Sequence, residues 1–208
     1  MASGFLKTDK ELLLKPLITM CLDFVNTLAY RGSSKTESLH TLADLIQWCS
    51  NAGAASARLA EKIRAWSERH PKRGSEIFGD AIVLREAIYR IFHAVVGDAN
   101  PGTADLELLN RALSDAPSRV TLQRATGGFG WQVEEDKPSA AVMLAPVLWS
   151  AGDLLVGLQL ARVRECSNEK CLWLFLDDSK NGTRRWCSMQ ACGNRAKAHR
   201  HYLRQKRT

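Results

Sequence analysis

The chain has 208 residues, of which 45% are hydrophobic and 25% charged, and this composition excludes a fully disordered, collagen-like or coiled-coil protein. Six cysteines are too few for a disulfide-dense secreted scaffold. The formal net charge is +7, and its position along the chain is more informative than its size.

The basic excess lies entirely at the C-terminal end. Residues 166–208 contain ten basic and three acidic side chains, whereas the preceding 165 residues contain 19 of each sign. A neutral body with a compact basic end is typical of a chain that binds a polyanion, most often nucleic acid. A solvated basic tail without a partner is the alternative interpretation.

Neither the N-terminus nor the longest apolar segment indicates export or membrane insertion. The first fifteen residues carry five charged side chains and no apolar run long enough for a secretory signal, so we expect a cytoplasmic protein. Residues 140–161 are long enough to span a bilayer, but Pro146 and Asp153 interrupt them. This segment favours a buried core helix and no contact with a membrane.

Hydrophobic residues recur at helical spacing through the first half of the chain. Ser38 is the expected N-cap of the first helix and Gly53 its stop, and Gly97 is expected to end the third. The pattern predicts helices over residues 39–49, 54–69, 75–96 and 103–113, with Pro117 marking the exit of the last.

The period then changes to two. Val120 and Leu122 alternate with polar neighbours, residues 126–128 supply turn chemistry, and Phe129, Trp131 and Val133 resume the alternation, which predicts a β-hairpin. An apolar helix over residues 139–161, bent at Pro146, is expected to follow. Residues 1–161 are therefore predicted to form one mainly helical domain with a small hairpin.

Four of the six cysteines form two short-spaced pairs, Cys166 with Cys171 and Cys187 with Cys192. Four thiolates complete the tetrahedral shell of zinc and leave no position for water, so we expect one structural zinc ion per chain rather than a catalytic one. Four unliganded thiols or a rubredoxin-like iron site are the alternatives. Cys21 and Cys49 lie in apolar surroundings and are predicted to be buried core thiols.

Residues 162–208 contain too few aliphatic side chains to form a core alone, which is the condition under which a small module needs a metal. We predict a treble-clef-like zinc finger, that is, a β-hairpin plus a helix. The helix is expected over residues 195–206 with Asn194 as its cap and Ala196, His199 and Leu203 as its inner stripe.

The basic residues of this segment are the candidate contacts to nucleic acid. One broad basic side of the helix is expected to be shared by Arg195, Arg200, Arg204 and Arg207. His199 and His201 could serve as alternative zinc ligands, but four cysteines already complete the shell, so both are interpreted as surface or phosphate-facing residues. The full candidate set is Arg184, Arg185, Arg195, Lys197, Arg200 and Arg204.

The segments 185–189 (Arg-Trp-Cys-Ser-Met) and 192–195 (Cys-Gly-Asn-Arg) closely resemble the CGNR zinc-finger family, as do Phe175, Asp177, Ser179 and Lys180. In that family the finger follows a helical domain called ABATE. The run Cys21-Leu-Asp-Phe-Val-Asn-Thr27 is similar to the opening motif of that domain, and Trp48 and Gly53 also fit it. The resemblance implies zinc at Cys166, Cys171, Cys187 and Cys192, DNA as the partner, and a stress-induced bacterial transcription regulator.

These features predict a DNA-binding regulator whose helical domain senses a ligand or mediates a homodimer. The alternatives are an RNA-binding module that stacks bases on Trp173 or Trp186, or a module that binds an acidic protein. No nucleophile–base pair or phosphate-cradling loop is visible in the sequence, so we do not expect an enzyme. The candidate ligand pocket consists of Asp23, Asn26, Thr27 and Arg31. The alternative is that Asp23 and Asn26 cap or satisfy nearby backbone amides.

Overall fold

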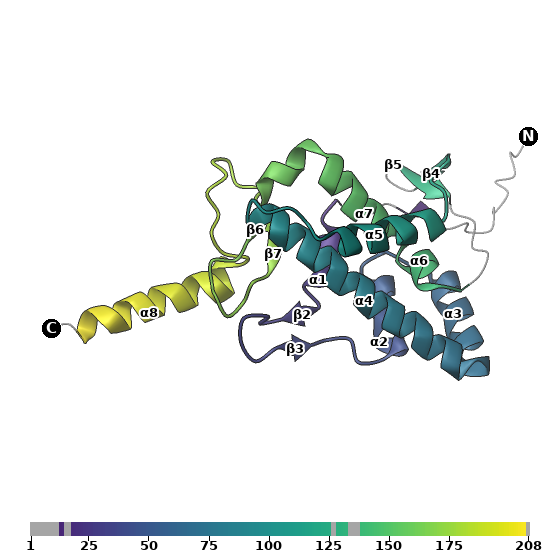
Figure 1. The fold of residues 1–208 in the computed structure, drawn as a ribbon, viewed down its shortest axis with the longest axis horizontal. Helices are drawn as coiled ribbons and strands as arrows, with labels where there is room; N and C mark the ends of the chain where they lie inside the picture. The colour runs from purple at the N-terminus through teal and green to yellow at the C-terminus, as the bar shows by residue number, and fades with distance from the viewer. Residues whose placement is uncertain (1–12, 15–17, 126–127, 133–137, 207–208) are drawn as a thin grey trace, which may run out of the picture.

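The computed structural model describes residues 13–14, 18–125, 128–132 and 138–206 (Figure 1). Its α-helices are α1 (Met20–Val25), α2 (Leu42–Asn51), α3 (Ala57–Arg69), α4 (Pro71–Val96), α5 (Thr103–Asp115), α6 (Ala140–Met143), α7 (Ala145–Val156) and α8 (Asn194–Gln205). Its strands are β1 (Leu13–Leu14), β2 (Leu28–Ala29), β3 (Thr36–Glu37), β4 (Thr121–Ala125), β5 (Gly128–Gln132), β6 (Val163–Glu165) and β7 (Leu174–Leu176). The predicted fold class is confirmed: a mainly helical N-terminal part with small hairpins precedes a hairpin and a helix.

Helix α4 is the central element of the helical part. It contacts α1, α2, α3, α5, α6 and β6, and it buries apolar side chains at the helical spacing seen in the sequence (Figure 1). It begins at Pro71, earlier than the predicted residue 75, because proline is well suited to the first turn of a helix. It ends at Gly97, as predicted.

Two other helix starts differ from the prediction because capping side chains decide them. Helix α2 begins at Leu42 and not at residue 39, since Thr41 and Asp44 form a reciprocal capping box. The Thr41 hydroxyl accepts from the Asp44 amide at 3.2 Å, and the Asp44 carboxylate accepts from the Thr41 amide at 2.9 Å. Helix α3 begins at Ala57 and not at residue 54, because the Ser56 hydroxyl accepts from the Leu59 amide at 2.8 Å.

The predicted apolar helix over residues 139–161 is buried, but it is not continuous. It divides into α6 and α7 at Leu144, and α7 starts with Pro146 in its first turn, where the missing proline amide costs nothing. Helix α7 ends at Val156 because Gly157 adopts an extended conformation, and a 3₁₀-helical turn follows over Leu158–Arg162. Among the described helices, none is long and apolar enough to cross a membrane.

The predicted hairpin is confirmed as β4 and β5, which pair antiparallel with Leu122 opposite Trp131. Strand β1 adds to the other edge of β5, so the sheet order is β1-β5-β4. The sequence analysis did not predict β1 or the short β2–β3 pair. The expected Val133 of the hairpin, and residues 126–127 of its turn, lie outside the described residues.

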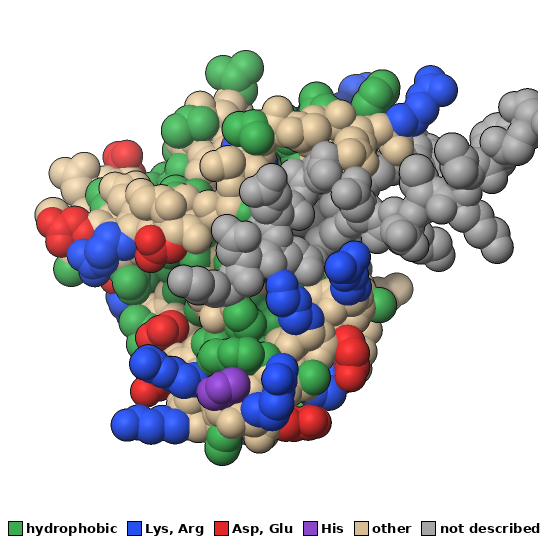
Figure 2. Space-filling model, turned by 90° about the vertical axis from the view of Figure 1, so that its right-hand side faces the viewer, with side chains coloured by type: hydrophobic (Ala, Val, Ile, Leu, Met, Phe, Trp, Pro, Cys, Tyr) green, Lys and Arg blue, Asp and Glu red, His purple; other side chains and the backbone are tan. Residues whose placement is uncertain are grey.

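Charges on the helical part are mixed in sign. On the face that Figure 2 shows, Lys and Arg side chains are interspersed with Asp and Glu side chains, in agreement with the zero net charge of the first 165 residues. At the opposite end of the molecule, α8 extends away from the body (Figure 1). This projecting helix carries four of the ten basic residues of the C-terminal end and no acidic one.

An ion network inside the helical part connects β3, α4 and the segment after α1. Arg85 is only 2% exposed, and its guanidinium donates to both carboxylate oxygens of Glu37 at 2.7 Å, to the Thr27 hydroxyl at 3.1 Å and to Glu86 at 2.9 Å. Glu86 also accepts from Arg31 at 2.6 and 3.1 Å. A buried guanidinium is tolerated only when it is paired in this way.

Replacement of Glu37 by glutamine should lower the free energy of unfolding at pH 7 by about 1–3 kcal/mol, because a buried charged hydrogen bond is lost. Burial raises the pKa of Glu37, but the hydrogen bonds from Arg85 outweigh it and hold this pKa below its ordinary value. The stabilisation is therefore present above about pH 4.3 and is lost as the pH falls through the folded-state pKa. Urea unfolding of the wild-type and Glu37→Gln proteins between pH 7 and pH 3 measures the difference in their free energies of unfolding. This difference should shrink below about pH 4.3.

The matched control is Glu61→Gln, which breaks an exposed pair with Arg64. This change should alter the free energy of unfolding by less than about 1 kcal/mol. An equal loss in the two variants would contradict the role given to the Arg85 network.

Candidate metal centre

The four paired cysteines come from two short segments that meet between the helical part and α8. Strand β6 pairs antiparallel with β7, and Glu165 lies opposite Leu174. Cys166 follows β6 and Cys171 lies three residues before β7, so the first pair occupies the tip of this hairpin. Cys187 lies in the loop after β7, and Cys192 lies in a π-helical turn over Met189–Gly193 that continues directly into α8.

The sulfur atoms form one compact cluster. All four Sγ atoms lie within 4.8 Å of one another, with 3.7 Å between Cys171 and Cys187 and 3.8 Å between Cys187 and Cys192. A tetrahedral zinc ion with Zn–S bonds of about 2.3 Å places its ligands about 3.8 Å apart. The cluster therefore suits one zinc ion, and its four ligands leave no coordination position for a substrate.

The thiol groups of this cluster do not ionise together without a cation. A hydrogen bond with Cys187 lowers the pKa of Cys166 to about 5, whereas burial raises the pKa of Cys171 to about 12. The shared hydrogen bond with Cys166, followed by burial, raises the pKa of Cys187. Four neighbouring thiolates would repel one another, and a divalent ion bound between them compensates their negative charges so that they can coexist.

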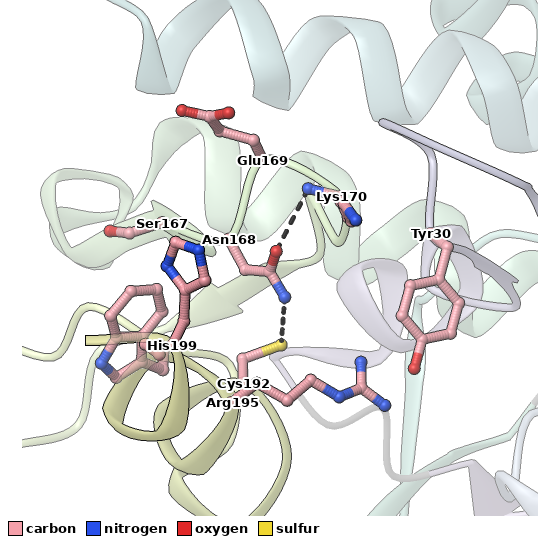
Figure 3. Close-up of a pocket in the computed structure, with 10 residues that line it drawn as sticks. Tyr30, Ser167, Asn168, Glu169, Lys170, Cys192, Arg195 and His199 are labelled. Atoms are coloured by element: carbon pink, nitrogen blue, oxygen red, sulfur yellow. Dashed lines mark hydrogen bonds between the residues drawn. The ribbon is translucent and has the colours of Figure 1, made fainter. Parts of the chain in front are cut away.

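Asn168 supports the cluster from within residues 167–170, which lie between the first pair of cysteines and are called the first cysteine turn. Its side-chain Nδ2 donates to Cys192 Sγ at 3.3 Å, and its Oδ1 accepts from the Lys170 amide at 3.2 Å (Figure 3). Its backbone carbonyl accepts from the Cys171 amide at 2.7 Å. The sequence analysis missed this residue, although an asparagine between two paired cysteines is a recognisable turn-former.

Asp177 closes the loop between β7 and the second pair of cysteines. It is fully buried and accepts hydrogen bonds from the Ser179 hydroxyl at 2.6 Å, the Ser179 amide at 3.0 Å and the Arg184 amide at 2.9 Å. These bonds, the Ser179 hydroxyl first, hold the pKa of Asp177 below its ordinary value. This buried carboxylate is one of the residues that carried the family resemblance.

The Arg184 side chain is 34% exposed and is bonded to other groups of the finger. Its guanidinium donates to the Trp186 carbonyl at 3.0 Å and to the Cys187 carbonyl, and it lies 4.7 Å from the ring centroid of Phe175. Trp173 and Trp186 pack against the cysteine cluster, with the latter partly buried. Arg184 was expected to face nucleic acid, but its donors are engaged here, whereas the neighbouring Arg185 is exposed.

Helix α8 differs from the prediction in its N-cap and in its inner stripe. It begins at Asn194, one residue early, and Asn194 does not cap it: the side chain donates to the Gln190 carbonyl at 3.2 Å. The expected inner stripe is wrong as well, because α8 extends beyond the body, where Leu203 is 43% exposed and His199 is exposed. His199 also lies outside the sulfur cluster.

The basic residues of α8 do not all lie on one side of the helix. Arg195 is directed toward Tyr30, with its guanidinium carbon 5.3 Å from the ring centroid (Figure 3). Lys197 and Arg204 are exposed and lie seven residues apart, on one face of the helix. The side chains of Arg200, His201 and Arg207 lie outside the described residues.

Three of the four residues predicted to line a ligand pocket bond to backbone groups of the interior. Asn26 pairs with the backbone of Leu174 in β7: its Oδ1 accepts from the amide at 3.1 Å and its Nδ2 donates to the carbonyl at 2.7 Å. Thr27 is buried and bonds to the Phe24 carbonyl at 2.7 Å, and Arg31 bonds to the Val25 carbonyl at 2.9 Å.

Asp23 is the exception among these four residues, because it is exposed on α1. The contacts of Asn26 favour the alternative in which it satisfies backbone groups, and Thr27 and Arg31 also bond to backbone groups. Their use as a ligand pocket stays a prediction.

The loop after β2 lies directly against the first cysteine turn. The Arg31 amide donates to the Cys171 carbonyl at 3.3 Å, and the Ser33 hydroxyl donates to the Lys170 carbonyl at 3.4 Å. Between them, a Cβ at Gly32 would lie 1.7 Å from the carbonyl oxygen of Glu169. Only glycine allows this approach, so the helical part supplies one support of the metal centre.

Gly32→Ala should force the loop away from the first cysteine turn. We expect a loss of about 1–3 kcal/mol in the free energy of unfolding and a several-fold faster transfer of zinc to a colorimetric chelator. Gly79→Ala in α4 is the matched control, because no atom lies within 4 Å of the added Cβ. It should stabilise the protein by about 0.5–1 kcal/mol and leave zinc transfer unchanged. Equal rates of zinc transfer from the two variants would contradict the role of the Gly32 loop in supporting the metal centre.

Cys187→Ser should reduce the zinc content from about one ion per chain to nearly none, because a structural zinc site depends on all four thiolates. Metal analysis of the purified chain measures this loss, and tryptophan fluorescence follows Trp173 and Trp186 as the cluster opens. Cys49→Ala is the control, since Cys49 is fully buried in the helical core, as predicted, and takes no part in the cluster. Full zinc content in the Cys187 variant would contradict a four-cysteine site.

Comparison with known families agrees with this geometry. Residues 19–158 match the family model of the ABATE domain, described as a putative stress-induced transcription regulator. Residues 162–205 match the model of the CGNR zinc finger, which contains the four-cysteine cluster. No curated protein matches the chain. The chain therefore belongs to the ABATE family, with a CGNR zinc finger at residues 162–205.

Proposed function

We propose that this protein binds duplex DNA through the exposed basic face of α8. The observation that carries the proposal is the position of this helix, which leaves the body at the zinc cluster (Figure 1). Its residues Lys197 and Arg204 are exposed. The transcription-regulator description of the family supports the same partner.

The zinc cluster gives the helix a fixed base. Cys192 lies in the π-helical turn that continues into α8, and its three sulfur partners lie on the β6–β7 hairpin and the following loop. Holding all four thiolates on one ion fixes the direction of α8 relative to that hairpin. An oriented helix can enter the major groove, which accommodates one α-helix, without first losing conformational entropy.

Two charged side chains on one helix face provide a defined set of phosphate contacts. Lys197 and Arg204 lie two turns apart, and Arg200 belongs to the intervening turn. Contacts of this kind position a protein on DNA and release counterions, so binding weakens steeply as salt increases. Exposed Arg185, next to the second cysteine pair, is a further candidate contact.

We assign the helical part, residues 1–161, a regulatory or dimerising role. Asn26 fastens it to β7 and the loop at Gly32 fastens it to the first cysteine turn, so a change in the helical part would reach the base of α8. An arrangement of this kind allows a signal received in one part to alter DNA binding in the other.

The full-length double variant Lys197→Ala/Arg204→Ala should bind random-sequence duplex DNA more weakly than the wild-type chain. The slope of log K against log salt should decrease in magnitude by about two units, one for each lost contact. Fluorescence anisotropy across a salt series measures both quantities, and zinc content verifies that the finger is intact.

The charge-matched control is Arg58→Ala/Lys72→Ala, two exposed residues of α3 and α4. It should leave the salt slope unchanged. The same slope for the α8 variant and the wild-type chain would contradict the proposed DNA contact. Tighter binding of structured RNA than of duplex DNA at equal salt would favour an RNA-binding module instead.

A further inference from the structure

A cavity of about 470 Å³ lies beside the metal centre, where three segments meet (Figure 3). The loop at Tyr30 forms one wall, the first cysteine turn at residues 167–170 forms the second, and the start of α8 forms the third. This volume is in the range of small-molecule sites. A molecule bound here would touch the helical part and the zinc finger at the same time.

The cavity has cationic side chains in its walls. Lys170 and Arg195 line it from two different segments, and Arg195 extends across it toward Tyr30 (Figure 3). The carboxylate of Glu169, which also belongs to the lining, is directed away from the other side chains in Figure 3. The site is therefore suited to an anion, and a phosphate group accepts hydrogen bonds from both kinds of cation.

Aromatic rings provide the second feature. Tyr30 lines the cavity from the helical part, and Trp186 and His199 line it from the finger. Flat rings of this kind stack on a heteroaromatic base, at about 1–3 kcal/mol per base. Cationic and aromatic groups in one cavity match a ligand that joins a phosphate to a base.

The backbone at Tyr30 is held in a costly conformation. Its φ is 53°, in the left-handed region, where a residue other than glycine loses about 1–2 kcal/mol. The following residues keep it there, because Arg31 donates to the Cys171 carbonyl and Gly32 lies against Glu169. Strain of this kind is found where a side chain must be presented to a ligand.

The thiolate of Cys192, the zinc ligand that lines the cavity, is shielded from an incoming ligand. Cys192 contributes to the lining but is only 3% exposed. The amide of Asn168 covers its sulfur with a hydrogen bond of 3.3 Å (Figure 3). The positive groups at the rim therefore dominate what an incoming anion meets.

We propose that this cavity binds a nucleoside monophosphate, with the phosphate between Lys170 and Arg195 and the base against Tyr30 and Trp186. This inference does not depend on DNA binding, because Arg195 and the Lys197–Arg204 face lie on different sides of α8. The bound nucleotide bridges the two parts of the protein and stabilises their contact. It is therefore a ligand through which the helical part and the finger act together.

Calorimetric titration of the zinc-loaded full chain with each of the four ribonucleoside monophosphates tests the proposal. At least one should bind, and Arg195→Ala and Lys170→Ala should each weaken that binding by about tenfold. Lys197→Ala, two residues along the same helix, is the matched control and should leave it unchanged. The corresponding nucleoside and inorganic phosphate should each bind at least about tenfold more weakly than the nucleotide.

A backbone phosphate of DNA is the other source of the same chemistry, so each variant is also titrated with duplex DNA. Arg195→Ala should keep the wild-type salt slope while weakening nucleotide binding by about tenfold. The proposal is overturned if none of the four nucleotides binds at millimolar concentration, or if neither Arg195→Ala nor Lys170→Ala weakens binding. It is also overturned if Arg195→Ala instead lowers the salt slope by about one unit, which would assign the cavity to DNA.

Discussion

Four sulfur atoms that share one ion determine how the last 43 residues are arranged. This segment has few aliphatic side chains of its own. Val163 and Leu174 of the β6–β7 hairpin pack into the core of the helical part, but packing alone could not hold the loop at Asp177 and the base of α8 to that hairpin. The four sulfur atoms, which lie within 4.8 Å of one another, join these segments. The buried bonds of Asp177 and the inward-facing guanidinium of Arg184 then fix the chain between the two cysteine pairs.

The same centre is supported from outside the finger. Asn26 supplies both a donor and an acceptor to the backbone of Leu174, as a neighbouring strand would, and Gly32 allows the next loop to touch the first cysteine turn. Arg31 belongs both to this loop and to the buried network around Arg85 and Glu86. The core of the helical part and the metal centre are therefore linked by short, directional contacts and not by a flexible connection.

The geometry also separates two kinds of basic residue that the sequence places in one run. Lys197 and Arg204 lie on an exposed face of α8, where phosphate of a long polyanion can reach them. Arg195 turns back toward Tyr30 and borders a cavity beside the cluster. A single helix can thus present one face to nucleic acid and another to a small anion, because positions two residues apart differ by about 200° around its axis.

The sequence by itself determined the helical class, the β4–β5 hairpin and the four zinc ligands, because hydrophobic periodicity and cysteine spacing are local properties. It did not determine the helix starts at Leu42 and Ala57, where the capping bonds of Thr41 and Ser56 override periodicity, or the break at Leu144. Only the tertiary structure decided the roles of Asn26, Gly32 and Asn168, whose partners lie far along the chain or across the cluster. It also decided which way each basic side chain of α8 faces, since that depends on which residues the neighbouring loop brings to the helix.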